Sequence, residues 1–235
     1  MAKKFYSLLL YLFVQYCFLV SVVRGQALLP NQLPNLVLWL RADSVIKDGN
    51  NRVSSWVNTI GGADFDQSVI NQQPLWVDNQ WNGQPVIRFN GSNYLDGGDN
   101  YDVGYNSRTV FVVFQANNSQ YSVLAKSLYG AADNRYAINN GGSGVQVYYR
   151  DNSDYLLSSM ASPVGRNLWS NLINRNSQQI SLYRNSISVG APLSGLQGGG
   201  YNFNSGFRFI VGGFNNSDDS GVEPSLNLDG SGATL

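Results

Sequence analysis

Histidine is absent from the 235-residue sequence, and cysteine and glutamate occur once each, as Cys17 and Glu223. Without histidine the chain cannot assemble a Ser-His-Asp or a Cys-His catalytic site. Zinc and redox metals would lack the imidazole and thiolate ligands on which their protein sites depend. A single cysteine also allows no disulfide within the chain, so a domain built from it must rely on its own hydrophobic core.

The sequence also has few residues that favour helices and no excess of positive or negative charge. Glutamate and lysine are scarce while Asn, Ser, Gly and Tyr are abundant, which disfavours helices. After residue 25 no segment keeps a 3.6-residue hydrophobic period. The formal net charge is zero, so the chain has no basic excess with which to hold nucleic acid. The sequence therefore predicts an all-β protein with no nucleic-acid partner.

The N-terminus is the exception to this pattern. Lys3 and Lys4 precede an apolar stretch at residues 8–23, and Val23-Arg24-Gly25 offers residues that a signal peptidase can read. We expect residues 1–25 to be a signal peptide, residues 26–33 a short lead, and residues 34–235 one domain. The protein would then be secreted or on the cell surface, with no membrane span after cleavage. A retained membrane anchor is the alternative.

Residues 82–115 organise the rest of the chain. Residues 85–89 alternate between two faces, and Asn90-Gly91 is a strong turn signal because both residues tolerate positive φ. Residues 110–114 have no polar face, which predicts a strand covered on both sides. Residues 36–42 also alternate and predict a strand, followed by a loop at 43–51. About a dozen such short segments, bounded by Asn, Gly, Ser and Asp, predict a two-sheet antiparallel β-sandwich.

The order of these segments resembles the bacterial laminin G-like domains of the concanavalin A-like lectin/glucanase superfamily. The resemblance spans residues 34–229 and rests on LVLWLRAD (36–43), VSSW (53–56), NGQPVIRFNG (82–91), SRTVFVVF (107–114), ISLYRN (180–185) and FRFIVGG (207–213). It implies a jelly roll of two curved sheets that binds glycans or proteins outside the cell. Domains of this family usually close with a strand after Leu-Asp-Gly. Here only Ser-Gly-Ala-Thr-Leu follows Gly230, so we expect the last strand to be missing and an unpaired sheet edge to cause self-association.

Catalysis is the first function to weigh, because glucanases share the fold that the resemblance implies. Those enzymes resemble one another in a Glu-x-Asp-x-x-Glu strand that aims two carboxylates into one cleft. This chain offers no such strand, because Glu223 stands alone before Pro224. The pair Asp64 and Asp66 has strand spacing and is interpreted as a polar outward face. We expect a protein that is not an enzyme, with a glycoside-active domain and a structural spacer as alternatives.

A calcium site is the second possibility. Asp96, Asp99 and Asp102 fall within one glycine-bearing loop, with Asn100 beside them. Calcium takes six to eight oxygen ligands in flexible geometry, so this donor set is chemically adequate. Related lectin and laminin G domains hold calcium at loop ends, which the resemblance carries over to this loop. The alternative is an ordinary turn in which the aspartates accept hydrogen bonds from nearby backbone amides.

A ligand-binding surface is the third possible functional site. Tyr148, Arg150, Asp151 and Tyr155 combine aromatic rings, which stack on sugars, with groups that can hydrogen-bond hydroxyls. Strand alternation lets only one of Tyr148 and Tyr149 face a ligand; ordinary surface tyrosines are the alternative. The predicted function is a secreted or surface binding or adhesion module whose partner is a glycan or an extracellular protein. Six further aromatic residues are expected in the core: Trp39, Trp56, Phe89, Phe111, Phe114 and Phe209.

Overall fold

The computed structural model describes residues 29–102, 106–115, 121–126, 135–141, 144–151, 154–160, 165–195, 206–215, 222 and 233–234. The chain divides into two compact units, residues 1–36 and 37–235. In the described part of the first unit, a short 3-10 helix, η1 (Pro30–Gln32), is closed by the Leu29 amide, which donates to Gln32 Oε1 at 2.8 Å. The predicted signal peptide lies outside the described residues. Among those residues no helix is long and apolar enough to cross a membrane.

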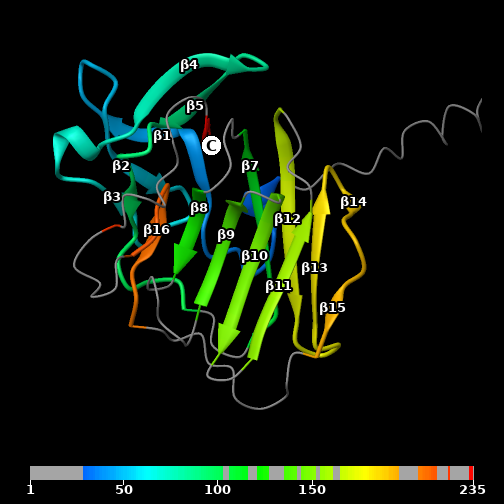
Figure 1. Cartoon of the computed structure of the whole chain (residues 1–235). Helices are drawn as coiled ribbons and strands as arrows, with labels where there is room; N and C mark the ends of the chain where they lie inside the picture. The colour runs from blue at the N-terminus through cyan, green and yellow to red at the C-terminus, as the bar shows by residue number, and fades with distance from the viewer. Residues whose placement is uncertain are drawn as a thin grey trace, which may run out of the picture. The chain divides into compact units, whose positions relative to one another are not determined.

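The described strands of the second unit form three antiparallel sheets (Figure 1). The largest, which we call sheet A, has the strand order β1-β2-β3-β6-β16-β8-β9-β10-β11. Its strands are β1 (Leu40–Lys47), β2 (Val53–Asn58), β3 (Phe65–Asp66), β6 (Leu95–Asp96), β8 (Tyr121–Lys126), β9 (Arg135–Gly141), β10 (Gly144–Asp151), β11 (Asp154–Met160) and β16 (Phe209–Val211).

Two smaller sheets complete the unit. Sheet B has the order β17-β5-β4, and sheet C has the order β14-β13-β12-β7 with β15 paired to β13. Their strands are β4 (Leu75–Trp81), β5 (Gln84–Phe89), β17 (Ala233–Thr234), β7 (Arg108–Phe114), β12 (Asn167–Asn174), β13 (Gln179–Arg184), β14 (Ile187–Ser188) and β15 (Leu193–Ser194). A second short 3-10 helix, η2 (Ile70–Gln72), precedes β4.

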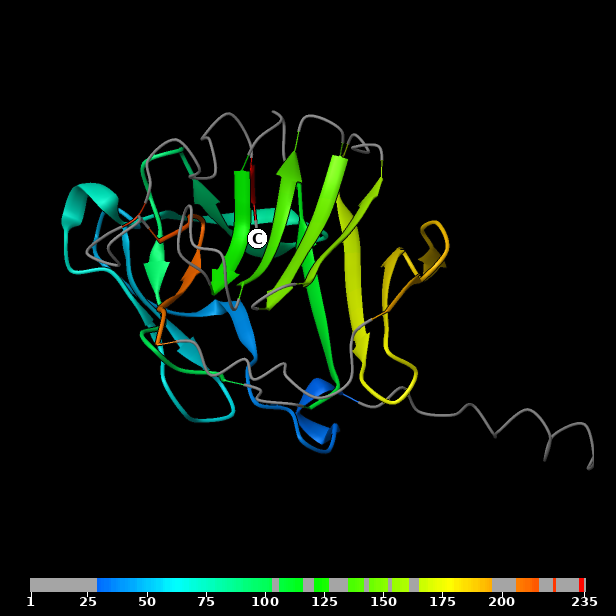
Figure 2. The ribbon, with the colours of Figure 1, turned by 60° about the horizontal axis from the view of Figure 1, so that its bottom comes forward.

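One hydrophobic core joins all three sheets. Alternating residues of β10, Val145, Val147 and Tyr149, pack in the same cluster as Trp169 of β12 and Phe89 of β5. In Figures 1 and 2 the green strands of sheet A and the yellow strands of sheet C are parts of this one packed body. The prediction of an all-β antiparallel sandwich is confirmed. The hydrogen-bonded pairing of the described strands, however, gives three sheets where the sequence predicted two.

Strand β1 lies further along the chain than predicted. It begins at Leu40 and runs through Asp43, where a loop was expected. Its register against β2 shifts between Leu40 and Val45, and this irregularity leaves carbonyls free for side chains. The indole of Trp56 donates to the carbonyl of Arg41 at 2.7 Å, and the indole of Trp76 donates to that of Ala42 at 2.8 Å. Two tryptophans therefore stabilise the bulge.

Two further expectations are wrong. Strand β7 was predicted to be covered on both faces, and Phe111 to be in the core, yet β7 ends sheet C and Phe111 is 62% exposed. The alternation of β7 explains this, because Phe111 and Val113 face away from the core that holds Phe114. The closing strand was expected to be missing. Ala233 and Thr234 nevertheless pair with Phe89 and Arg88 of β5.

A buried cation crosses between sheets A and C. The guanidinium of Arg108, on β7, lies 4.2 Å from the ring centre of Tyr136 on β9 and 5.6 Å from that of Tyr149 on β10. Burial lowers the pKa of Arg108 and raises the pKa of Tyr136. The phenol of Tyr136 donates to Asn171 Oδ1 on β12 at 3.2 Å. These contacts connect the two sheets across the core.

Candidate functional site

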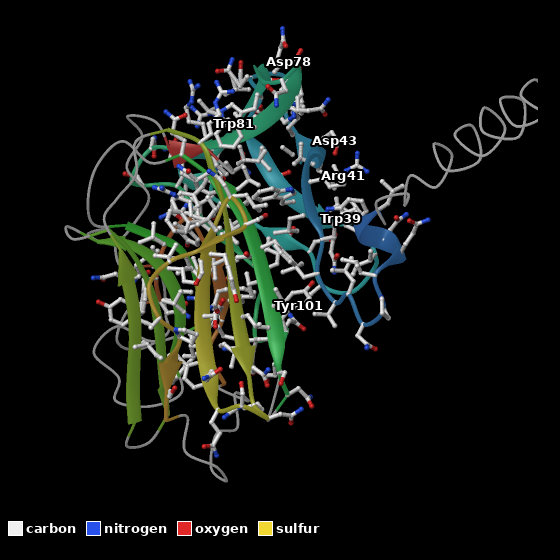
Figure 3. All side chains as sticks on the ribbon, turned by 90° about the vertical axis from the view of Figure 1, so that its right-hand side faces the viewer. Trp39, Arg41, Asp43, Asp78, Trp81 and Tyr101 are labelled. Carbon is white, nitrogen blue, oxygen red and sulfur yellow. The ribbon has the colours of Figure 1, made fainter. Side chains whose placement is uncertain are left out.

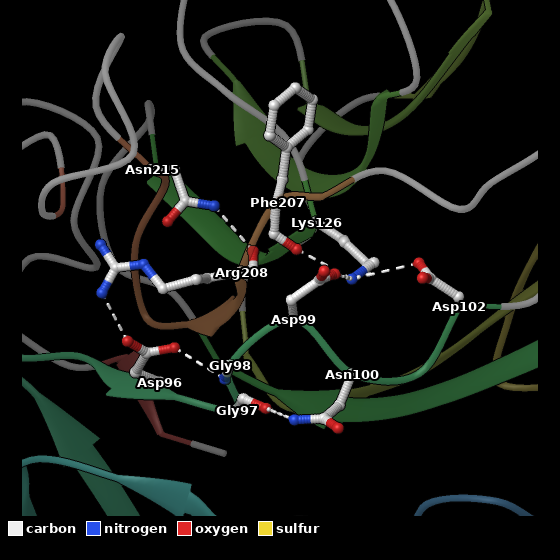
Figure 4. A network of polar contacts seen from close by, with 10 residues as sticks. All are labelled: Asp96, Gly97, Gly98, Asp99, Asn100, Asp102, Lys126, Phe207, Arg208 and Asn215. Atoms are coloured by element: carbon white, nitrogen blue, oxygen red, sulfur yellow. Dashed lines mark hydrogen bonds and ion pairs between the residues drawn. The ribbon is translucent and has the colours of Figure 1, made fainter.

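The predicted calcium loop at residues 96–102 is held by cations of the protein itself (Figure 4). Asp96 accepts from Arg208 at 2.6 Å through Oδ2 and from the amide of Gly98 at 2.8 Å through Oδ1. Asn100 folds back to donate to the carbonyl of Gly97 at 2.7 Å. The carboxylate of Asp96 is therefore already bound by an arginine and by a backbone amide of its own turn.

The other two aspartates share one lysine. Lys126, at the end of β8, is only 5% exposed, and its Nζ lies 2.9 Å from Asp99 and 3.2 Å from Asp102. The same ammonium donates to the carbonyl of Phe207 at 2.8 Å. Calcium would have to displace this lysine to reach both carboxylates. In the described part of the chain, no group of three His, Cys, Asp or Glu residues is placed to hold a metal ion, and the calcium site stays a prediction.

A second set of polar residues lies on the face of sheet A that points away from the core, which we call the outer face of sheet A. The backbone register aligns Ser122 of β8, Asn139 of β9 and Gln146 of β10 in one row across the sheet. The register of β8 shifts between Ser122 and Leu124, and this shift brings Ser122 into line with Asn139. We call these three residues the amide row.

Tyr148 stands next to the amide row. It is two residues beyond Gln146 on β10, half-buried, and its hydroxyl donates to Gln146 Oε1 at 3.0 Å. Its ring packs against a small apolar cluster formed by Ala125, Ala137 and Phe214. This packing holds the ring in place, which limits the entropy that a ligand stacking on it would lose.

The amide row has unused hydrogen-bonding capacity. Ser122 is 1% exposed, and its hydroxyl has no hydrogen-bond partner among the described residues. The buried Oδ1 of Asn139 likewise has none. Buried polar atoms are normally satisfied, and each exception in a folded protein calls for an explanation such as an ordered water or a ligand. A half-turn of the half-buried Asn139 amide would exchange its oxygen and its NH₂ group.

Of the four residues predicted to bind a ligand, the structure describes the side chain of Tyr148 alone. Tyr149 is buried in the core while Tyr148 is on the outer face, so alternation separates them as expected. The backbone register pairs Arg150 with Tyr155. The same register pairs Asp151 with Asp154. The side chains of Arg150, Asp151 and Tyr155 lie outside the described residues.

Two carboxylates also meet on the outer face of sheet A. Asp66 of β3 and Asp96 of β6 are directly opposite each other in the antiparallel register, an arrangement that places Cβ atoms about 5 Å apart. Asp66 is exposed, and Asp96 is paired with Arg208. A glycosidase needs one carboxyl in an apolar site that keeps it protonated. Neither residue has such surroundings. The neighbouring Asp64 accepts from the amide of Asn58 at 2.8 Å, which is a structural role.

A third polar group lies along β1 (Figure 3). Arg41 and Asp43 form an exposed ion pair at 2.5 Å, and the guanidinium of Arg41 lies 5.2 Å from the ring centre of Trp39. Trp39 was predicted to be in the core, but it is only half-buried. The three residues already satisfy one another, and an exposed ion pair of this kind contributes little to stability. This group is a weaker candidate than the amide row.

Sequence reasoning found Tyr148 but missed the amide row. Alternation along β10 places Gln146 opposite Val145 and Val147, so its outward position could have been inferred. Ser122 and Asn139 could not, because their alignment depends on which strands pair and on the register shift in β8. Lys126 and Arg208 as partners of the aspartates were also missed, since Arg208 is 112 residues from Asp96 in the sequence.

Comparisons with known proteins place the chain in no family. No family model matches it, and no curated protein does. Among solved structures, one described as "NanB plus Optactamide" is similar at 17% identity and a TM-score of 0.46, over 63% of this chain and 24% of that one. The carbohydrate-binding module CBM40 of a Ruminococcus gnavus IT-sialidase, bound to α2,3-sialyllactose, is similar at 16% identity and a TM-score of 0.40, over 54% of this chain and 71% of that one. At these levels the likenesses assign neither a family nor a function to the chain.

Proposed function

We propose that this protein is a secreted, non-catalytic module that binds carbohydrate on the outer face of sheet A. The observation that carries the proposal is the amide row with Tyr148 at its side. Amides, a hydroxyl and a phenol are neutral groups that exchange hydrogen bonds with sugar hydroxyls, and an aromatic face can pack on the C–H surface of a sugar ring. The hydroxyl of Ser122 and the Oδ1 of Asn139, which no described residue engages, add hydrogen-bonding groups for a ligand.

The rigid setting of these groups supports a binding role. Ser122, Asn139 and Gln146 are on three paired strands, and Tyr148 is held by Phe214 and its neighbours. Sites built on strands keep their geometry better than sites built on loops. Secretion is part of the proposal on the strength of the N-terminal charge and hydrophobicity pattern. Laminin G-like kinship remains a proposal that rests on the order of the sequence segments.

A glycoside-active domain is the second candidate, and the facing carboxylates of Asp66 and Asp96 are the observation that favours it. One experiment separates the two. The purified protein is incubated with a panel of β-glucans and other surface polysaccharides, and co-sedimentation is read alongside the release of reducing ends. The proposal expects retention on at least one polysaccharide without new reducing ends. Release of reducing ends that disappears in Asp66→Asn would establish hydrolysis instead. The absence of both co-sedimentation and release of reducing ends would favour a spacer or a protein-binding module.

A further inference from the structure

The free edge of β7 is the starting point. Strand β7 is seven residues long and, in the described part of the chain, pairs only with β12, from Asn167 opposite Phe114 to Ile173 opposite Arg108. Among the described strands none pairs with its other edge, which there presents a row of backbone N–H and C=O groups. Such an edge is a ready template for one more strand. What fits it is an extended segment, because backbone groups in this spacing match only another strand.

The outward side chains of β7 extend the same surface. Phe111 is 62% exposed and Val113 is 44% exposed, and both point away from the core. The register aligns Val113 with Leu168 and Thr109 with Leu172 on β12, both half-buried, so the apolar surface continues onto the next strand. An added strand would bury apolar side chains as well as satisfy hydrogen bonds.

The other sheet edges whose side chains are described carry protection that β7 lacks. Strand β1 has two register shifts and the exposed charges Arg41, Asp43 and Lys47. Strand β4 has a register shift and Asp78. Strand β14 is only two residues long. Charges, bulges and shortness are the devices that keep edges from associating. Strand β7 is long and regular, and its one charge, Arg108, is buried between the sheets.

We propose that β7 pairs with β7 of a second copy of this chain, antiparallel and about a two-fold axis. An antiparallel pair of identical strands is self-complementary, and closed two-fold dimers are the commonest protein oligomers. The segment from Thr109 to Phe114 bears no charge, so two copies meet without repulsion. Centred on Phe111, the pairing sets Phe111 against its own copy and Val113 against Thr109 of the partner subunit. Aromatic and β-branched cross-strand pairs of this kind stabilise sheets.

The test is sedimentation of the purified protein across a concentration series, with two matched variants. Phe111→Lys puts two ammonium groups opposite each other at the axis, whereas Ile187→Lys adds the same charge at a site that is 71% exposed on β14. We expect a reversible dimer whose dissociation constant rises at least about tenfold in Phe111→Lys and stays unchanged in Ile187→Lys. Both substitutions are at exposed positions, so unchanged melting temperatures would exclude misfolding as the cause.

A crosslinking measurement fixes the strand and its register. Phe111→Cys and Ile187→Cys are compared under mild oxidation. The proposal expects a disulfide-linked dimer in Phe111→Cys well above the level in Ile187→Cys. A protein that sediments as a monomer at all concentrations overturns it. So does a dimer that survives Phe111→Lys, or one in which the two cysteine variants crosslink equally.

Discussion

Three glycines allow the packing of the sandwich to be tested by single substitutions. A Cβ atom at Gly212, after β16, would lie 2.4 Å and 2.5 Å from two ring atoms of Phe89, which is fully buried. Gly212 also has a φ of +84°, and its amide donates to the carbonyl of Val123 at 3.0 Å. Alanine at this position would meet both a steric and a conformational penalty, and neither the ring nor the backbone is free to move.

Two other glycines separate the penalties. A Cβ atom at Gly97 would lie 2.7 Å from two ring atoms of buried Phe65, with φ in the ordinary region, so only overpacking applies. Gly190 has a φ of +70° with nothing within 4 Å, so only the backbone penalty applies. Overpacking costs about 1–3 kcal/mol and the left-handed conformation costs a non-glycine residue about 1–2 kcal/mol. Gly212→Ala should therefore lower the free energy of unfolding by about 2–5 kcal/mol, close to the sum of the other two.

Urea denaturation followed by tryptophan fluorescence measures all three, since Trp56 and Trp169 are buried reporters. The denaturant slope should stay constant, so that midpoint shifts report stability. Against a typical total of about 5–15 kcal/mol, this loss is a large fraction of the stability, and at the low end of that range Gly212→Ala would unfold the domain. The reasoning is refuted if Gly212→Ala and Gly190→Ala destabilise equally, because the contact with Phe89 would then carry no energy.

Three further predictions concern charged groups. Replacing both Asp99 and Asp102 by Asn leaves the buried ammonium of Lys126 without a carboxylate and should lower the free energy of unfolding by about 3 kcal/mol in urea denaturation. Asp99→Asn alone, at a half-exposed position, should lower it by less than about 1 kcal/mol. Equal losses in the two variants would contradict the shared ion pair. Burial raises the pKa of Tyr136 above its unfolded value of about 10, so the stability that depends on its neutral form is complete below about pH 10 and is lost as the pH rises further. Tyr136→Phe should flatten that alkaline loss in a titration of unfolding free energy, and an unchanged slope would count against the buried phenol. Calcium at about 1 mM, the weak end of extracellular sites, should leave the melting temperature unchanged because Lys126 occupies two of the carboxylates. A rise that Asp99→Ala abolishes would instead establish the calcium loop.

Alternation and turn chemistry predicted most of the strands. The turn at Asn185-Ser186 joins β13 and β14 with φ values of +49° and +67°, a backbone conformation that asparagine tolerates better than most residues. Strand β1 was misplaced, because its bulge depends on indoles that reach it from β2 and β4. Strand β11 was not predicted at all. Local patterns reveal which residues alternate, but they do not reveal which strand becomes an edge, and Phe111 was misassigned to the core for that reason.

The candidate site was less predictable than the fold. Tyr148 follows from alternation along one strand, whereas the amide row exists only because three strands pair in a particular register. The aspartates of residues 96–102 were recognised as a cluster, but their cations come from β8 and from the residue just before β16. Pairing between segments that are far apart in the sequence decides both cases. A carboxylate cluster read from sequence alone cannot be distinguished from a set of ion pairs.

The claim that sugar binds on the outer face of sheet A is tested most directly by variants of Tyr148, with a polysaccharide that co-sediments with the wild-type protein. The affinities of the wild-type protein, Tyr148→Ala and Tyr183→Ala are compared, since Tyr183 is another half-buried tyrosine, on β13 of sheet C. Loss of a stacked ring should weaken binding about tenfold in Tyr148→Ala, while Tyr183→Ala should bind like the wild type. Equal affinities for all three proteins, with unchanged melting temperatures, would show that the outer face of sheet A is not where the sugar binds.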